Sequence, residues 1–308
     1  MSEKLPKSWG ESNMAELRLA IIGVGLIGGS FGLAIKDKLG DNVHITGFCR
    51  SQASMDAAVR RGAVDEASAD IAAVVRTADV VYLSTPVLQM APIVKKIRPF
   101  LKAGAVLTDA GSTKAYLWQA IPPLLGDSVY YVSGHPMTGK EKSGAAAADK
   151  ELFRNKCYVI MEETTAPPEV YQRVVELIKL TGANLTTLDV ATHDRCASVI
   201  SHVPHVTAAA LVTLLERSAG DLASCLKLAG GGFKDTTRIA SSNADMWADI
   251  CLTNAAAITR HLRNLREILG EAASAIEAGD RETIHAYFAA AKKRRDCILD
   301  KTEKLFDI

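Results

Sequence analysis

Residues 23–28 read Gly-Val-Gly-Leu-Ile-Gly, and this hexapeptide lies between a short apolar segment and an apolar helical pattern. A G-x-G-x-x-G turn between a strand and a helix is typical of a site for the pyrophosphate of a dinucleotide. Gly23 permits the tight turn, Gly25 lets the backbone approach the phosphates, and Gly28 lets the helix pack against the sheet. The helix then directs free N–H groups toward the phosphates. We therefore predict a cofactor site at Gly23, Gly25, Leu26, Ile27 and Gly28.

Apolar strand patterns alternate with helical patterns over the first 187 residues. Such alternation predicts βαβ units and a mainly parallel sheet, that is, a Rossmann-type α/β domain. The predicted strands are Leu17–Ile22, Val43–Phe48, Val80–Ser84, Ala105–Thr108, Val129–Val132 and Cys157–Met161. The predicted helices are Leu26–Leu39, Gln52–Arg61, 87–101, 113–125 and 168–181.

Beyond about residue 188 the strand patterns stop and the sequence becomes rich in Ala and Leu with helical periodicity. The predicted helices are 191–218, 221–229, 236–241, 244–278 with a possible break, and 281–305. We expect a loose tail over 1–16, a dinucleotide-binding domain over 17–187 and an all-α domain over 188–308. Because an appended all-α domain often buries its apolar faces against a second copy, we also expect a homodimer.

The charge balance argues against two classes of binding partner. Lys and Arg number 36 and Asp and Glu number 35, so the formal net charge is +1, which gives no electrostatic case for nucleic acid or an anionic membrane. The uncharged run Leu19–Ile35 is better explained by a buried strand and a glycine turn than by a membrane span. None of the six cysteines forms a C-x-x-C pair, so we expect reduced thiols in a cytoplasmic protein.

The end of the second predicted strand bears on the choice between NAD and NADP. NAD-binding domains carry an acidic residue about 20 positions beyond the glycines, where it holds the ribose hydroxyls. This chain has Cys49 there, followed by Arg50 and Ser51. A neutral residue beside an arginine can accept a 2′-phosphate, whereas an exposed Arg50 without a cofactor role is the alternative. The sequence therefore predicts NAD or NADP, with Arg50 and Ser51 as candidate contacts.

Three polar clusters follow predicted strands, where open α/β sheets bind their ligands. The first cluster is Ser84-Thr85-Pro86, which we expect beside the cofactor. The others are residues 109–114, which include Ser112, and residues 133–137, which include His135. Because histidine exchanges protons near neutral pH, His135 at a strand exit is a candidate acid–base group, with Ser112 as a second catalytic candidate.

The helical half supplies a second set of polar residues. Spacings of four, three and four place Asp194, Ser198, Ser201 and His205 on one helical face, although Pro204 can kink that helix. His202 and His205 lack a nearby acidic or Cys ligand, so we predict no metal site. Residues 230–238 combine three glycines with two cations. Lys234 and Arg238 are therefore candidate ligands for substrate carboxylates.

Together these segments resemble the prephenate/arogenate dehydrogenase family of tyrosine biosynthesis. The resemblance runs in order along nearly the whole chain from Leu17. Its less specific part is the glycine motif, and its specific part is the succession of later segments. Those segments are Asp109–Lys114, Gly134–Gly139, His193-Asp194, Ser201–His205, Gly230–Asp235 and Thr237–Ala240.

The resemblance implies oxidative decarboxylation of a cyclohexadienol, prephenate or arogenate. A hydride passes to the nicotinamide, the ring carboxylate leaves as carbon dioxide, and the ring becomes aromatic. His135 then accepts the proton of the ring hydroxyl with help from Ser112, and Arg238 binds a substrate carboxylate and is oriented by Asp194. The pocket is lined by Ser201 and His205.

Two other readings of the sequence remain open. A β-hydroxyacid dehydrogenase or a related reductase shares the two-domain plan, but it would not need a His-Pro strand exit together with Arg238. A non-catalytic dinucleotide-sensing dimer would bind the cofactor without turnover. A change at His135 would then leave its behaviour unaltered.

Overall fold

The computed structural model describes residues 17–140, 144–218 and 220–306. The predicted tail, 1–16, lies outside these residues. The chain divides into two compact units, Met1–Asn254 and Ala255–Ile308. The first five helices that follow the sheet therefore belong to the same compact unit as the sheet.

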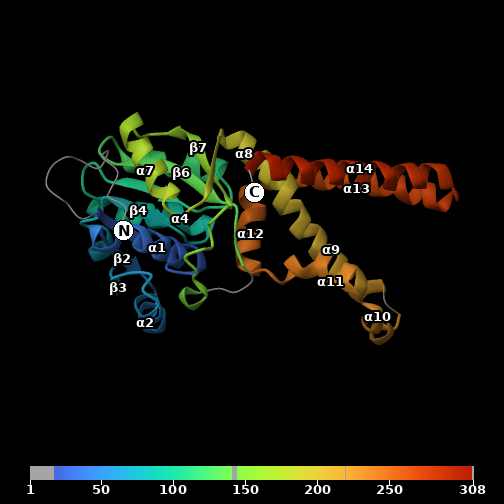
Figure 1. Ribbon diagram of the computed structural model, residues 1–308, viewed down its shortest axis with the longest axis horizontal. Coiled ribbons are helices and arrows are strands. Elements are labelled where there is room, and N and C mark those ends of the chain that lie inside the picture. Colours follow the sequence, from blue (N-terminus) through green and yellow to red (C-terminus); the bar gives the residue numbers. More distant parts are fainter. Residues whose placement is uncertain (1–16, 141–143, 219, 307–308) are drawn as a thin grey trace. The chain divides into compact units, whose positions relative to one another are not determined.

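An eight-stranded sheet with the order β3-β2-β1-β4-β5-β6-β7-β8 forms the centre of the first unit (Figure 1). Its strands are β1 (Leu17–Ile22), β2 (Val43–Phe48), β3 (Glu66–Ser68), β4 (Val80–Leu83), β5 (Val106–Asp109), β6 (Tyr130–Pro136), β7 (Cys157–Thr164) and β8 (Asn184–Leu188). All neighbouring strands pair in parallel except β6 and β7, which are antiparallel. The mainly parallel Rossmann-type sheet predicted from the sequence is confirmed.

Helices cover both faces of the sheet, because alternate strand residues point to opposite sides. Leu19 and Ile21 of β1 join one apolar core with Phe31, whereas Ala20 and Ile22 join the other. Helices α1 and α7 contribute to the first core, and α3 to α6 contribute to the second. The helices of this part are α1 (Leu26–Leu39), α2 (Gln52–Arg60), α3 (Ile71–Val75), α4 (Val87–Ile97), α5 (Ala115–Ala120), α6 (Pro122–Leu125) and α7 (Pro168–Lys179).

After β8 the first unit continues only as helices, as predicted. They are α8 (Val190–Ala197), the π-helical turn η5 (Ser198–His202), α9 (Val203–Ser218), α10 (Leu222–Leu228), α11 (Gly231–Thr237), the 3-10 turn η6 (Arg238–Ser241) and α12 (Ala244–Thr253). The sequence predicted one helix over 191–218. The structure instead inserts η5, where Val203 N–H donates to the carbonyl of Ser198, directly before Pro204. Because proline has no N–H and its ring crowds the carbonyl four residues back, the local change of helix type accommodates Pro204.

The second unit is a pair of helices, α13 (Ala255–Glu277) and α14 (Arg281–Phe306), which pack against each other. Gly279 between them has φ +65°, a conformation that glycine adopts without strain. The break that the sequence allowed within 244–278 falls at Asn254, the C-cap of α12. One run in the first unit, Val190–Arg217, is long and apolar enough to cross a membrane by length and composition, with a mean hydropathy of 1.5.

Several short elements escaped the sequence patterns. Strands β3 and β8 and helix α3 were not predicted. The single helix expected over 113–125 is wrong, because the chain forms α5 and then α6, which begins at Pro122. A proline fits the first turn of a helix, where its missing N–H would have no partner.

Candidate active site

The glycine turn after β1 packs tightly against the end of β4. The Ser84 hydroxyl donates to the carbonyl of Gly23 at 2.8 Å. A Cβ at Gly28 would lie 2.3 Å from Ser84 Oγ and 2.5 Å from the Gly23 carbonyl oxygen, so only glycine fits there. Gly23 itself has φ +96°. The turn is therefore fixed in shape by its own close contacts.

The space in front of this turn fits a dinucleotide. Gly25 is the N-cap of α1 and provides no capping side chain, which leaves the first N–H groups of the helix, including those of Leu26 and Ile27, for a ligand. A Cβ at Gly25 would meet nothing within 4 Å. The buried Thr85 hydroxyl finds no hydrogen-bond partner among the described residues, and Pro86 follows it as the N-cap of α4. An open glycine and an unsatisfied hydroxyl at adjacent strand ends are features that a bound cofactor explains.

The residues predicted at the adenosine end lie directly after β2. Cys49 is buried and Arg50 is exposed. The hydroxyl of Ser51 caps α2, where it accepts the N–H of Ser54 at 3.3 Å. Ser51 therefore already serves as the N-cap of α2, whereas the exposed Arg50 side chain does not pack in the core.

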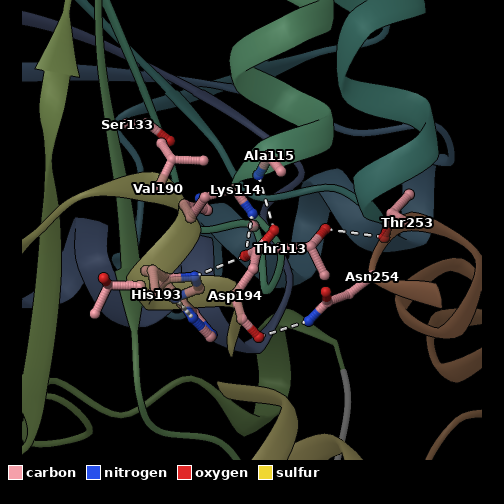
Figure 2. Close-up of polar contacts among 12 residues, drawn as sticks. Thr113, Lys114, Ala115, Ser133, Val190, His193, Asp194, Thr253 and Asn254 are labelled. Carbon is pink, nitrogen blue, oxygen red and sulfur yellow. Dashed lines mark hydrogen bonds and ion pairs between the residues drawn. The ribbon is translucent and has the colours of Figure 1, made fainter. Parts of the chain in front are cut away.

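His135 lies on β6 and is held in a chain of buried side chains. Its Nδ1 is 2.9 Å from Nε2 of His193, and Nδ1 of His193 is 2.8 Å from Oδ1 of Asp194. The Asp194 carboxylate also accepts the backbone N–H groups of Lys114 at 2.8 Å and Ala115 at 2.9 Å (Figure 2). Burial lowers the pKa of His135 well below 6.5, and the neighbouring His193 and Lys114 lower it further. His135 is therefore uncharged at neutral pH and able to accept a proton.

A fully buried ion pair lies next to His135. Lys114 Nζ is 2.5 Å from Oδ1 of Asp109 and donates to the carbonyl of Gly134, also at 2.5 Å. The other Asp109 oxygen accepts the hydroxyls of Tyr131 at 2.7 Å and Ser133 at 2.8 Å. Since Gly134 precedes His135 on β6, this network fixes the backbone that carries the imidazole.

Ser112 is half-buried in the loop between β5 and α5. Its neighbours hold that loop on both sides: Gly111 N–H donates to Asp109 at 2.7 Å, and the Thr113 and Thr253 hydroxyls are 2.9 Å apart. The loop is therefore fixed at the carboxyl end of β5, the edge of the sheet from which His135 also emerges.

The helical candidates gather partly around His205. Its Nδ1 donates to the carbonyl of Ser201 at 2.8 Å, and its ring stacks on Trp247 with centroids 3.9 Å apart. Burial lowers the pKa of His205, and the nearby Arg238 charge lowers it further. Arg238 is exposed at the start of η6, and Lys234 is exposed on α11. The structure thus brings Ser201, His205 and Arg238 into one neighbourhood.

The structure assigns Asp194 a contact set different from the one expected. We expected it to orient Arg238 and bind substrate, but its buried carboxylate engages His193 and the start of α5. Asn254 adds a second anchor, because its Nδ2 donates to the Asp194 carbonyl at 2.8 Å and lies 3.2 Å from His202 Nδ1. Among the described residues no three His, Cys, Asp or Glu side chains are placed to share a metal ion.

Sequence reasoning did not assign a role to His193, Lys114 or Asn254. The contact of His193 with His135 spans 58 positions and that of Asn254 with Asp194 spans 60, whereas Lys114 and Asp109 pair across the loop between β5 and α5. No helical or strand spacing joins any of these pairs. The only available signal was that Asp109 and Lys114, which carry opposite charges, lie in one short segment after a predicted strand. The ring of Trp247 lies against His205, and its buried indole N–H has no partner among the described residues.

The buried histidines predict acid destabilisation. Burial lowers the pKa of His202 to about 4, and that of His135 also falls below 6.5. The unfolded chain therefore binds protons from about pH 6.5 downward while the folded protein does not, so stability falls as the pH falls through this window. We expect the free energy of unfolding to drop by about 2 kcal/mol per such histidine between pH 7 and pH 5. Urea unfolding at both pH values measures this drop, and an unchanged midpoint would contradict it.

Fold and site together define the class: a dinucleotide-dependent oxidoreductase with an N-terminal nucleotide-binding domain and helices after it. Family models then identify two segments. Residues 31–187 match the nucleotide-binding domain of prephenate dehydrogenase, and residues 189–290 match the dimerization domain of prephenate dehydrogenase. The chain belongs to the prephenate dehydrogenase family.

Individual relatives agree with this assignment. The prephenate dehydrogenase of Lactococcus lactis subsp. cremoris is 35% identical over 283 residues, which cover 91% of this chain and 77% of that protein. The crystal structure of prephenate dehydrogenase from A. aeolicus in complex with hydroxyphenyl propionate and NAD+ is similar with a TM-score of 0.85, at 30% identity, and the match covers 94% of this chain and all of that one. Synechocystis arogenate dehydrogenase gives a TM-score of 0.77 at 27% identity, covering 92% and 100%.

Proposed function

We propose that this protein is a prephenate dehydrogenase, which converts prephenate to 4-hydroxyphenylpyruvate by NAD(P)-dependent oxidative decarboxylation in tyrosine biosynthesis. The observation that carries the proposal is His135, a buried and uncharged imidazole at the end of β6 whose Nδ1 is already occupied by His193. Its Nε2 is then the atom that accepts the proton of the ring hydroxyl. The Lactococcus relative and the A. aeolicus complex support this choice of substrate and cofactor class.

The remaining residues bind and orient. Ser112, held in its loop beside the β5 end, assists His135 at the hydroxyl. Arg238 binds a carboxylate of the dianionic substrate, which a guanidinium holds with two parallel hydrogen bonds. Lys234, Ser201 and His205 complete the substrate wall, and Asp194 acts through His193. When bound, the oxidised nicotinamide supplies the hydride acceptor.

The cofactor is NAD or NADP, bound at the glycine turn, Ser84, Thr85 and Pro86. We expect Arg50→Ala to raise the Michaelis constant for NADP at least about tenfold more than that for NAD, because loss of a charged hydrogen bond costs about 1.5–3 kcal/mol. Steady-state kinetics with each cofactor measure the two constants. Arg60→Ala, in the exposed last turn of α2, is the control. Equal changes for both cofactors would reject a role for Arg50 in recognising the 2′-phosphate.

The experiment that tests the function crosses two substrates with two cofactors. Prephenate and arogenate are each incubated with NAD and NADP, and the absorbance of the reduced nicotinamide is followed. Turnover of prephenate supports the proposal, and turnover of arogenate alone would make the protein an arogenate dehydrogenase. Cofactor binding without turnover in all four reactions would favour the dinucleotide sensor instead.

We further propose a cytoplasmic homodimer formed through the helical part. Exposed apolar side chains are concentrated there: Val199, Ile200, Val212, Leu214, Leu222, Leu226 and Leu228. The dimerization-domain match over 189–290 favours a second copy over lipid as the cover for this surface, and it supports a domain boundary near residue 188. Buried His193 and Asp194 in the run 190–217 also argue against a membrane location. A monomeric mass by light scattering at micromolar concentration would refute the dimer.

A further inference from the structure

Three side chains form a continuous hydrogen-bonded chain behind the candidate proton acceptor. His135 on β6 contacts His193 on α8, and His193 contacts Asp194 beside it. The exposed fractions are 8% for His135, 2% for His193 and 5% for Asp194, so water does not compete for these bonds. Each ring nitrogen of His193 faces one of these two groups.

The direction of each bond follows from Asp194. Its carboxylate accepts N–H groups from Lys114 and Ala115 and is held ionised by these bonds and by His193, which outweigh burial and keep its pKa below 3.8. An ionised carboxylate can only accept, so the hydrogen between it and His193 belongs to Nδ1 of His193. Because His193 holds its hydrogen on Nδ1, its Nε2 accepts from Nδ1–H of His135.

We propose that His193 is a positioning residue that, anchored by Asp194, holds uncharged His135 in the tautomer with hydrogen on Nδ1 and a lone pair on Nε2. This inference rests on the proposed function, because it assigns Nε2 of His135 as the proton acceptor. The O–H bond of the substrate hydroxyl breaks, a new N–H bond forms at Nε2, and His135 becomes an imidazolium. Its Nδ1–H bond to His193 persists throughout, so no side chain has to turn.

The residues around the hydrogen-bonded series His135–His193–Asp194 favour this single arrangement of hydrogens. Asp194 is fixed by the backbone of the β5–α5 loop and, through its own carbonyl, by Asn254 at the end of α12 (Figure 2). Apart from His193, the titratable groups that act on His135 are Lys114 and His202. Both lower the pKa of His135 and so disfavour a positive charge on its ring before substrate binds. The opposite tautomer of His135 would place its bare Nδ1 against the bare Nε2 of His193 across 2.9 Å.

The test uses His193→Leu and His193→Gln in the full-length protein. Leucine removes both polar contacts, so His135 loses its directing partner. Glutamine keeps a polar partner for His135, but its amide can turn either way and no longer transmits the direction set by Asp194. We expect kcat to fall about 10²–10³-fold for His193→Leu and less for His193→Gln, with the Michaelis constants for substrate and cofactor within about threefold, since a misdirected catalytic histidine loses turnover rather than binding.

A readout on the protein without substrate separates this inference from the proposed function. Nitrogen NMR of protein labelled in histidine should show His135 with hydrogen on Nδ1 in the native chain and a mixture of tautomers in both variants. His44→Gln, which removes a histidine from β2, should leave the His135 signals and kcat unchanged. Native protein with hydrogen on Nε2 of His135, or a His193→Leu variant with the native tautomer and native kcat, would overturn the inference. Absence of turnover in the native protein would instead count against the proposed function alone.

Discussion

His135→Asn should lower kcat by a factor of about 10²–10⁴, the usual contribution of a positioned acid–base group. The asparagine amide reaches the position of the imidazole Nδ1 and can still donate to His193, so the buried contact at 2.9 Å is retained. No atom of asparagine reaches the position of Nε2, and the substrate hydroxyl loses its proton acceptor. The expected loss therefore lies in turnover and not in folding.

Steady-state kinetics with saturating cofactor measure this effect, and quenching of intrinsic fluorescence by the reduced cofactor checks that the dinucleotide still binds. His44→Asn is the matched control, because His44 is a partly exposed histidine on β2. A kcat for His135→Asn within about threefold of the native value would show that His135 is not the proton acceptor.

Lys114→Met should lower the free energy of unfolding by about 3–5 kcal/mol, because it leaves a buried carboxylate without its counterion. Neither side chain of the Lys114–Asp109 pair is exposed to solvent. The hydrogen bonds from Gly111, Tyr131 and Ser133 to Asp109 remain, but they carry no compensating charge. Methionine preserves most of the side-chain volume, so the loss reports on charge and not on a cavity.

Urea unfolding at fixed protein concentration measures the loss, and two further variants identify its origin. The double variant Lys114→Met with Asp109→Asn removes both charges and should regain part of the stability. Lys102→Met breaks an ion pair with Asp79 that is 39% and 34% exposed, and it should cost about 1 kcal/mol or less. A loss for Lys114→Met no greater than that for Lys102→Met would show that the buried pair does not need its counterion.

The sequence predicted the parts of the fold whose signals are local. The bounds of β1, α1 and β2 agree with the prediction because a mostly apolar strand, a glycine turn and Gly40 mark their ends. Short β3 and α3 carry too few residues for a period to appear. The antiparallel direction of β7 depends on which strand it pairs with, and no local pattern encodes that choice.

In the candidate site, too, the residues that could be predicted are those with a local signal in the sequence. Strand exits identified Ser84, Ser112 and His135, since the carboxyl ends of parallel strands share one edge of the sheet. His193 was missed because its contact with His135 spans 58 positions and joins a strand to a helix. The contacts of the Asp194 carboxylate with His193 and the start of α5 were not foreseen for a similar reason: helical spacing gives the face of a residue but not which backbone amides lie opposite it.

The π-helical turn between α8 and α9 has a consequence for anyone who edits this chain. This turn contains one residue more than a regular α-helical turn, because Val203 N–H bonds to the carbonyl five residues back instead of four. In a regular α-helix each residue rotates the side-chain direction by about 100°. Deleting one residue from 198–202 would therefore let the segment close into an ordinary α-helix, and the side chains of α9 would keep roughly their present direction relative to His193. Deleting one residue from the regular part of α9 would instead turn every later position of that helix by about 100°. A one-residue deletion within 198–202 is thus the change that leaves the apolar row of α9 and the ring of His205 facing as they do, but it places Pro204 in a regular α-helical turn, where its ring crowds the carbonyl four residues back.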